Sequence, residues 1–199
     1  MFARSWKFGA ALLFLFAAAQ SRAATVTIDY SVSQVSGSTY EYIYSIFNDG
    51  SLPSGGPVQL FDIDFPTALY SNLVIETPSN LETQWYDQIF PGSGSVPSLY
   101  DVCATPSGDP TCPTTSGVTS GNTVSGFAVE FTYLGGGTPG SQAFTIYNAS
   151  NPSQQLEVGQ TSPEPSTICL GAFALALVGY LMRRGRLLPP PGIKENECL

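Results

Sequence analysis

The sequence of 199 residues contains no histidine. Because an imidazole is the usual base beside a nucleophilic serine or cysteine, this absence excludes Ser-His-Asp and Cys-His catalytic arrangements. It also excludes zinc sites that depend on histidine ligands. What remains for catalysis in this chain is carboxylate chemistry.

Basic side chains are missing from the whole middle of the chain, since none occurs between Ala24 and Ser162. The acidic residues, 15 in all, lie mostly in that region and give the chain a net charge of −8. A domain without lysine or arginine cannot neutralise phosphates, so nucleic-acid binding is excluded. Its carboxylates can be balanced only by metal ions, counterions or a basic partner. The seven basic residues are Arg4, Lys7, Arg22, Arg183, Arg184, Arg186 and Lys194.

The N-terminus has the three parts of a secretory signal peptide. Arg4 and Lys7 form a positive region, and the apolar stretch 8–19 follows. Small residues precede a cleavage point after Ala23. This pattern predicts that residues 1–23 are removed by signal peptidase. A retained N-terminal anchor is the alternative interpretation.

The C-terminal part has the pattern of a second targeting signal. Its residues are Pro163, Glu164, Pro165, Arg183, Arg184 and Arg186. The two prolines prevent a continuous helix and hold the triplet extended. The uncharged run 168–182 between the triplet and the arginines predicts a transmembrane helix, shorter than the roughly 20 residues that span a bilayer comfortably. The arginines should stay in the cytoplasm by the positive-inside rule. An ordinary short membrane anchor is the alternative.

The triplet, the short apolar helix and the arginine cluster together resemble the PEP-CTERM sorting signal of bacterial exported proteins. The resemblance covers residues 163–186 and leaves 187–199 as a cytoplasmic tail. It implies that an exosortase-type membrane protease recognises the motif and removes the segment downstream. It also implies a membrane-anchored intermediate, a final location at the cell surface or outside the cell, and exopolysaccharide surroundings.

Period-two alternation of apolar residues predicts that residues 24–150 form an all-β, antiparallel β-sandwich, jelly-roll-like or Ig-like. Residues 25–35 and 39–48 read as a hairpin that turns at Gly37. Further strands are expected at 59–65, 69–77, 84–90, 123–134 and 142–147, with no helix between them. Residues 151–162 are polar and read as a linker to the membrane.

The same alternation separates buried from exposed positions on two strands. The residues expected to be buried are Phe61, Ile63, Phe65, Phe127, Val129 and Phe131. The carboxylates between them, Asp62, Asp64 and Glu130, are expected on the solvent face. A register slip by one residue would move these carboxylates into a core without any basic partner.

Cys103 and Cys112 lie in one Pro-, Gly- and Thr-rich segment of a chain with an export signal. An oxidising compartment favours a disulfide between them. Closing so short a loop stabilises by roughly 2–3 kcal/mol in the chain-entropy model. Two free thiols on a mobile loop are the alternative.

Two groups of side chains are candidates for ligand contacts. Asp62 and Asp64 lie two apart on a strand and could supply half of a calcium site, although a solvated strand face has the same pattern. Tyr40, Tyr42 and Tyr44 form a stripe that stacks on sugar rings if it is exposed, or packs between sheets if it is not. No metal or other cofactor is expected beyond this calcium candidate.

These observations predict an exported cell-envelope or extracellular-matrix protein with a structural or adhesive role and no enzymatic activity. A carbohydrate-binding module, with or without calcium, is the alternative. A carboxylate-type glycoside hydrolase is a third hypothesis, since it would need two acids facing each other across a cleft.

Overall fold

The structure, a computed structural model, describes residues 25–105 and 111–164. The chain divides into two compact units, Met1–Pro163 and Glu164–Leu199. The described part of the first unit is a β domain with a single short helix, α2 (Ser79–Glu82). Its ten strands are β1 (Val26–Ser36), β2 (Thr39–Asn48), β3 (Leu60–Phe65), β4 (Tyr70–Ile75), β5 (Tyr86–Phe90), β6 (Ser98–Cys103), β7 (Thr123–Tyr133), β8 (Ala143–Asn148), β9 (Asn151–Gln160) and β10 (Ser162–Pro163).

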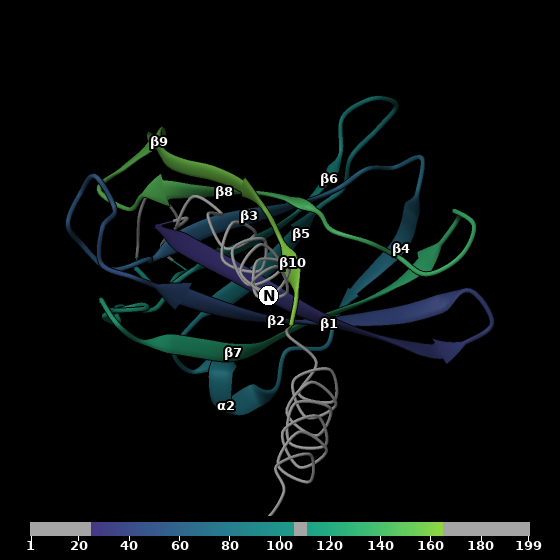
Figure 1. Cartoon of the computed structure of the whole chain (residues 1–199), viewed down its shortest axis with the longest axis horizontal. Coiled ribbons are helices and arrows are strands. Elements are labelled where there is room, and N and C mark those ends of the chain that lie inside the picture. Colours follow the sequence, from purple (N-terminus) through teal and green to yellow (C-terminus); the bar gives the residue numbers. More distant parts are fainter. Residues whose placement is uncertain (1–24, 106–110, 165–199) are drawn as a thin grey trace, which may run out of the picture. The chain divides into compact units, whose positions relative to one another are not determined.

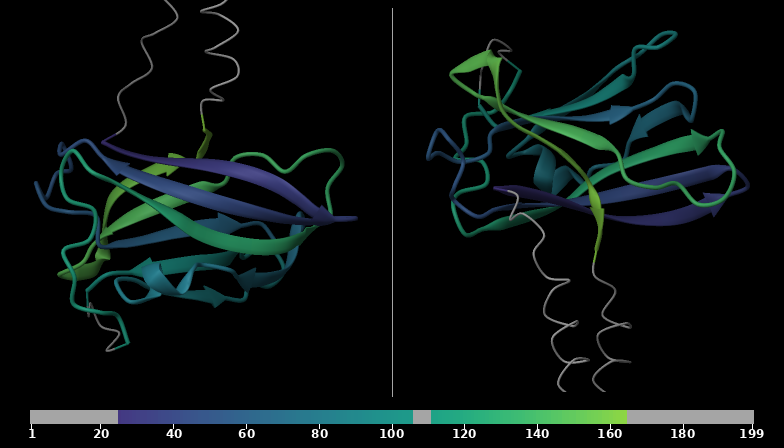
Figure 2. Two further views of the ribbon diagram at one scale, coloured as in Figure 1. Left: turned by 90° about the horizontal axis from the view of Figure 1, so that it is seen from below. Right: turned by 45° about the horizontal axis from the view of Figure 1, so that its top comes forward.

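The strands form two five-stranded sheets that stack face to face (Figures 1 and 2). The first sheet has the order β10-β1-β2-β7-β4, and the second has the order β5-β6-β3-β8-β9. All neighbours are antiparallel except β1 and β10, which run parallel. The prediction of an antiparallel sandwich is confirmed at this level.

The predicted hairpin is present as β1 and β2, which pair from Val26 opposite Asn48 to Ser36 opposite Thr39. Gly37 lies in the turn with a φ of 52°. Residues that carry a side chain rarely adopt this left-handed backbone conformation, so glycine suits the turn.

The core is a layer of aromatic and branched side chains between the two sheets. Tyr42 contacts Phe65 across the sheets with ring centroids 6.2 Å apart, and Phe61 meets Phe127 at 5.4 Å. Tyr42 and Tyr44 are fully buried, and the half-buried Tyr40 packs against the same core, so the tyrosine stripe is core packing. The six apolar positions expected inside are all buried: Phe61, Ile63, Phe65, Phe127, Val129 and Phe131.

The predicted polar linker over 151–162 was wrong. Residues 151–160 form β9, a ten-residue edge strand paired with β8, and 162–163 form β10. Strand β9 has no apolar alternation because both of its faces meet solvent along most of its length. It also contains Pro152, which an edge strand tolerates because one side of its backbone has no partner strand. Strand β6 and the single turn of α2 were also not predicted.

The last segment of the domain is fastened to the first strand. The Glu157 carboxylate accepts hydrogen bonds from the Thr25 hydroxyl and, at 2.9 Å, from the Val26 amide. The Ser162 hydroxyl donates to Asp29 at 2.9 Å, and Pro163 pairs with Tyr30 in the parallel register. The chain therefore crosses from the edge of one sheet to the other and closes the sandwich (Figure 2).

Cys103 and Cys112 form the predicted disulfide, with their Cα atoms 5.6 Å apart. Cys103 is the last residue of β6, so the bridge fastens a loop to a strand of the second sheet. Both cysteines are buried beside Leu60, and Tyr86 and Tyr147 pack against this small cluster.

Most of the two predicted signals lies outside the described residues. This holds for the signal peptide 1–23 with its cleavage point at Ala23, the apolar run 168–182, the tail 187–199, and Pro165, Arg183, Arg184 and Arg186. Pro163 and Glu164 fall within the described range, at the junction of the two units. Across 25–105 and 111–164, no helix has the length and apolar character that crossing a membrane requires.

Candidate functional site

The outer face of the second sheet carries a pair of carboxyl groups at its centre. Asp62 on β3 lies opposite Asp101 on β6 and Thr145 on β8. Asp62 points away from the core, as the alternation predicts, but it is only 8% exposed. The expectation that it would be exposed was wrong, because side chains from neighbouring strands cover it. Asp64 and Glu130, at half-buried positions, retain partial access to solvent.

The environment raises the pKa of Asp62 to about 7. Burial is the largest cause, and the hydrogen bond to Asp101 and the charge of that residue act in the same direction. A hydrogen bond from Tyr147 opposes the rise. Two carboxyl groups this close cannot both ionise easily, so Asp62 holds the shared proton up to neutral pH.

One oxygen of this pair is left without a partner. Asp62 Oδ1 is buried and has no hydrogen bond. Asp101 is supported from the other side by Gln88 on β5, whose Nε2 donates to Asp101 Oδ1 at 3.1 Å. In the described part of the chain, no three acidic or cysteine side chains gather closely enough to hold a metal ion. The calcium candidates Asp62 and Asp64 share a face, as predicted, but lack a third ligand of that kind.

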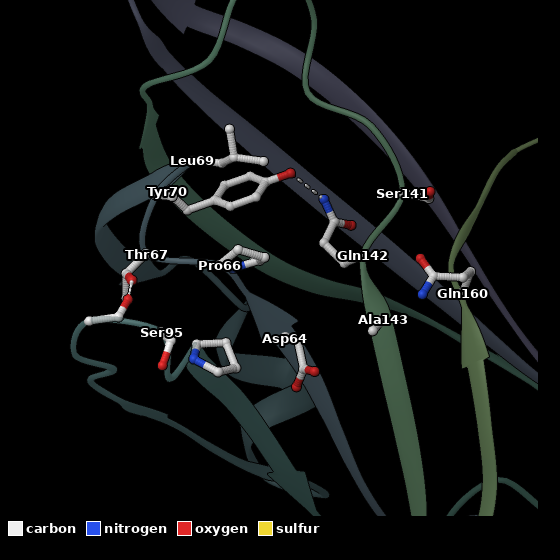
Figure 3. Close-up of a pocket in the computed structure, with 13 residues that line it drawn as sticks. Asp64, Pro66, Thr67, Leu69, Tyr70, Ser95, Ser141, Gln142, Ala143 and Gln160 are labelled. Carbon is white, nitrogen blue, oxygen red and sulfur yellow. Dashed lines mark hydrogen bonds between the residues drawn. The ribbon is translucent and has the colours of Figure 1, made fainter.

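A pocket of about 370 Å³ opens at one end of the sandwich, beyond Asp64 (Figure 3). Three connections converge there: the segments from β3 to β4, from β5 to β6 and from β7 to β8, together with the end of β9. The lining residues are Asp64, Pro66, Thr67, Ala68, Leu69, Tyr70, Gly94, Ser95, Pro97, Ser141, Gln142, Ala143 and Gln160. We call this site the end pocket.

A hydrogen-bonded network fixes one wall of the end pocket. Gln142 is 2% exposed, and its Nε2 donates to the Tyr70 hydroxyl at 3.0 Å and to the Gly140 carbonyl at 2.6 Å. Its Oε1 accepts from the Tyr44 hydroxyl at 3.3 Å and from the Thr161 hydroxyl at 3.2 Å. All four hydrogen-bonding positions of this amide are therefore used, and Gln142 serves to hold the wall rather than to bind a ligand.

Other polar groups of the end pocket are available to a ligand. Within the described ranges, the side chains of Asp64, Ser95, Ser141 and Gln160 make no hydrogen bond to the protein. Figure 3 shows the Asp64 carboxylate between Ser95 on one side and Ala143 on the other. Partial burial raises the pKa of Asp64 above its ordinary value.

The carboxylates considered for hydrolysis do not meet. Glu130 on β7 lies on the outer face of the first sheet, opposite Glu41 on β2. Asp62 and Asp64 lie on the outer face of the second sheet, so the core separates them from Glu130. These residues form no pair across a cleft of the kind a glycoside hydrolase needs.

No pattern in the sequence predicted the end pocket, although Asp64 was a candidate residue. The other polar groups of the pocket come from three connections and from β9, whose residues were predicted to be a linker. The association of Asp62 with Asp101 was also missed, because β6 was not predicted. A strand pattern at 98–103, SLYDVC, would have placed Asp101 on the outer face, with Tyr100 and Val102 inside.

Comparisons with known proteins do not assign a family. No family model matches the chain, and no curated protein matches it either. Among solved structures, the GH20 exo-β-N-acetylglucosaminidase from Vibrio harveyi is similar with a TM-score of 0.34 in its complex with N-acetylglucosamine, and with 0.35 in an inactive mutant. The identities are 12% and 10%, over 71% of this chain and only 18% of the enzyme. A CaDoc0917–CaCohA2 complex is similar with a TM-score of 0.29 and 13% identity, over 69% of this chain and 99% of that one. At such TM-scores these similarities carry no argument about function.

Proposed function

We propose that the chain is an exported protein of the bacterial cell envelope or extracellular matrix, sorted by a PEP-CTERM signal at residues 163–186. The sandwich domain has a structural or adhesive role in exopolysaccharide surroundings and is not an enzyme. The observation that carries this proposal is the position of the fold's end. The domain closes at Pro163, which is the first residue of the Pro-Glu-Pro triplet.

Charge and cross-linking support an exported location. The described domain is stabilised by a disulfide, which persists in oxidising compartments. Its charged side chains are all acidic, so it is repelled by anionic lipid headgroups and stays clear of the membrane surface. Both properties suit a domain that works outside the cytoplasm.

The strand order supports an Ig-like assignment of the sandwich. In Ig-type domains, strands A, B, E and D form one sheet and strands C, F and G form the other. Here β1-β2-β7-β4 corresponds to the first set and β3-β8-β9 to the second, with β5 and β6 added beside β3. Many cell-surface domains share this sandwich architecture.

The proposed route involves two proteases. Signal peptidase removes residues 1–23, and the apolar run 168–182 then holds the chain in the membrane as an intermediate. An exosortase-type protease cuts downstream of the triplet and releases the domain to the cell surface or the medium. The proposal includes no cofactor, and calcium at Asp62 and Asp64 stays a prediction for a titration to test.

A pair of epitope tags tests the sorting proposal. One tag is inserted after Ala24 and the other follows Leu199, in a host that carries the proposed protease. We expect the mature protein to keep the first tag and lose the second. Glu164→Ala should leave export intact and cause an uncut, membrane-bound form to accumulate. A surface form of the wild-type chain that retains both tags would contradict sorting and indicate a plain membrane anchor.

A carbohydrate-binding module is the second candidate function. The end pocket favours it, because this pocket combines apolar walls with a carboxylate, an amide and hydroxyls that the protein leaves unbonded. Small-molecule sites in proteins have this composition, with volumes of roughly 300–1,000 Å³.

A further inference from the structure

The charges around the end pocket restrict the ligand first. Asp64 lines it, and Asp62 and Asp101 lie behind Asp64 on the same face of the sheet. The region from 24 to 162 contains no lysine, arginine or histidine that could compensate a further negative charge. The carboxylates would therefore repel an anionic ligand, and no cationic side chain of this region would offset that repulsion. The ligand must be neutral or cationic.

The mixture of polar groups then favours a neutral ligand. A metal ion needs acceptors alone, and its usual sites contain several carboxylates. The end pocket offers one carboxylate, Asp64, together with groups that also donate: the Gln160 amide and the Ser95 and Ser141 hydroxyls. A ligand with many hydroxyl groups uses both kinds, since each hydroxyl donates one hydrogen bond and accepts others.

The walls of the end pocket match the apolar faces of a sugar ring. Pro66, Leu69 and Pro97 contribute hydrocarbon surface, and Leu69 is 40% exposed. The pocket's volume, about 370 Å³, lies at the lower end of the range for small-molecule sites. It therefore suits the end of a glycan rather than a long stretch of chain.

The end pocket is also held in shape before any ligand arrives. Gln142 is fixed by its hydrogen bond to the Tyr70 hydroxyl (Figure 3) and by one from the Thr161 hydroxyl. The Thr67 hydroxyl donates to the Gly94 carbonyl at 2.7 Å. A rigid site loses little conformational entropy on binding. Strand β9, which closes the domain, supplies Gln160 to the same wall.

We propose that the end pocket binds a neutral, terminal sugar residue of a glycan. The Asp64 carboxylate accepts hydrogen bonds from adjacent hydroxyls of the ring, while Gln160, Ser95 and Ser141 bind the remaining hydroxyls. The apolar ring face packs against Pro66 and Leu69. This proposal rests on the carbohydrate-binding function proposed above and names its site and its class of ligand.

Calorimetric titration of the full chain, purified in a polyoxyethylene detergent without sugar headgroups, tests the proposal. The probes are a panel of neutral oligosaccharides of glucose, galactose, mannose and N-acetylglucosamine, with oligogalacturonate as the anion and calcium chloride as the cation. Asp64→Asn removes the charge but keeps the shape, and Ser95→Trp fills the pocket. Glu82→Gln is the matched control, because Glu82 is an exposed carboxylate on α2, away from the pocket.

We expect saturable binding of at least one neutral probe, a loss of about tenfold or more in Asp64→Asn, no binding in Ser95→Trp, and wild-type affinity in Glu82→Gln. Unchanged thermal unfolding of each variant shows that the fold is intact. The proposal would be overturned if no neutral probe bound, or if both pocket variants bound the probe as tightly as the wild type. Tighter binding of oligogalacturonate or calcium than of any neutral probe would also overturn it. The result of the tag experiment does not depend on these outcomes. A chain that keeps both tags but still binds a sugar would contradict the sorting proposal and leave the sugar-binding proposal standing.

Discussion

Replacing Asp62 by asparagine should stabilise the domain at alkaline pH and change little in acid. Asparagine has nearly the same shape as aspartate, and at the position of Asp62 Oδ2 its amide can keep either the hydrogen bond from Tyr147 or the one to Asp101. It differs in that it never ionises. The substitution therefore isolates the effect of charge on the buried carboxyl pair at the centre of the second sheet.

The sign follows from the raised pKa. Below an ordinary value of 3.8, Asp62 is protonated in the folded and the unfolded chain, so it has no pH-dependent effect. Between 3.8 and the folded pKa of about 7, the unfolded chain has released this proton into water while the folded chain still holds it, so each rise in pH favours the unfolded chain until both are ionised. Stability is lost across this window. The difference between the two pKa values corresponds to a ceiling of about 4 kcal/mol.

Urea unfolding at pH 4.0, 5.5 and 8.5, followed by the fluorescence of the buried Trp85, measures the effect. We expect Asp62→Asn to exceed the wild type by about 2–4 kcal/mol at pH 8.5 and to approach it at pH 4.0. Glu82→Gln, at an exposed position, serves as the control and should show no such gain. Equal stabilities at pH 8.5, or the same difference at pH 4.0 and 8.5, would refute the assignment of a buried, shared proton.

Three further predictions test the packing of the domain by the same unfolding measurement. The double variant Cys103→Ser/Cys112→Ser should lose roughly 2–3 kcal/mol, and a variant as stable as the oxidised wild type would show that the bridge constrains nothing. Thr161→Val should lose about 1–3 kcal/mol because it leaves the buried backbone N–H of Gln142 without its acceptor, the Thr161 hydroxyl. Thr161→Ser keeps a hydroxyl and should retain most of the stability. Equal losses in the two variants would contradict this account. Gly117→Ala should lose roughly 1–3 kcal/mol or more, since a Cβ at φ +65° would lie 2.2 Å from the Val58 carbonyl oxygen. Gly55→Ala has a similar φ of +64° and open space around it, so a loss as large as that of Gly117→Ala would show that the close contact is unimportant.

The strands with a clear apolar alternation could be predicted from the sequence. Residues in β1, β2, β3 and β7 follow the period of two, and the apolar positions expected inside are buried. A few outward positions, Leu60, Asp62 and Ala128, are buried as well. Local pattern was sufficient there because each of these strands has one face against the core.

Strand β9 could not be predicted in this way. Its residues are mostly exposed on both faces, and its identity as a strand comes from backbone pairing with β8. A polar edge strand and a polar linker have the same composition, so only the tertiary partner distinguishes them. This difference matters for function, because it removes the expected tether between the domain and the Pro-Glu-Pro triplet.

The candidate site depends on contacts between residues that are distant in the sequence. Asp62 is buried because Asp101 and Tyr147, from two other strands, lie beside it. The end pocket is assembled from three connections whose ends meet only in the folded sandwich. The sequence could indicate Asp62 and Asp64 as outward residues, but not that one would be covered and the other would line a pocket.

Mass spectrometry of the intact, unreduced protein from the envelope of a producing cell tests the central claim most directly. The account predicts a chain that begins at Ala24, ends at or shortly after the Pro-Glu-Pro triplet, and carries the bridge between Cys103 and Cys112. It also predicts that no peptide from 168–186 remains attached. A mature chain that still extends through Arg186 to Leu199 would contradict the account, because the domain would then be held by a permanent membrane anchor.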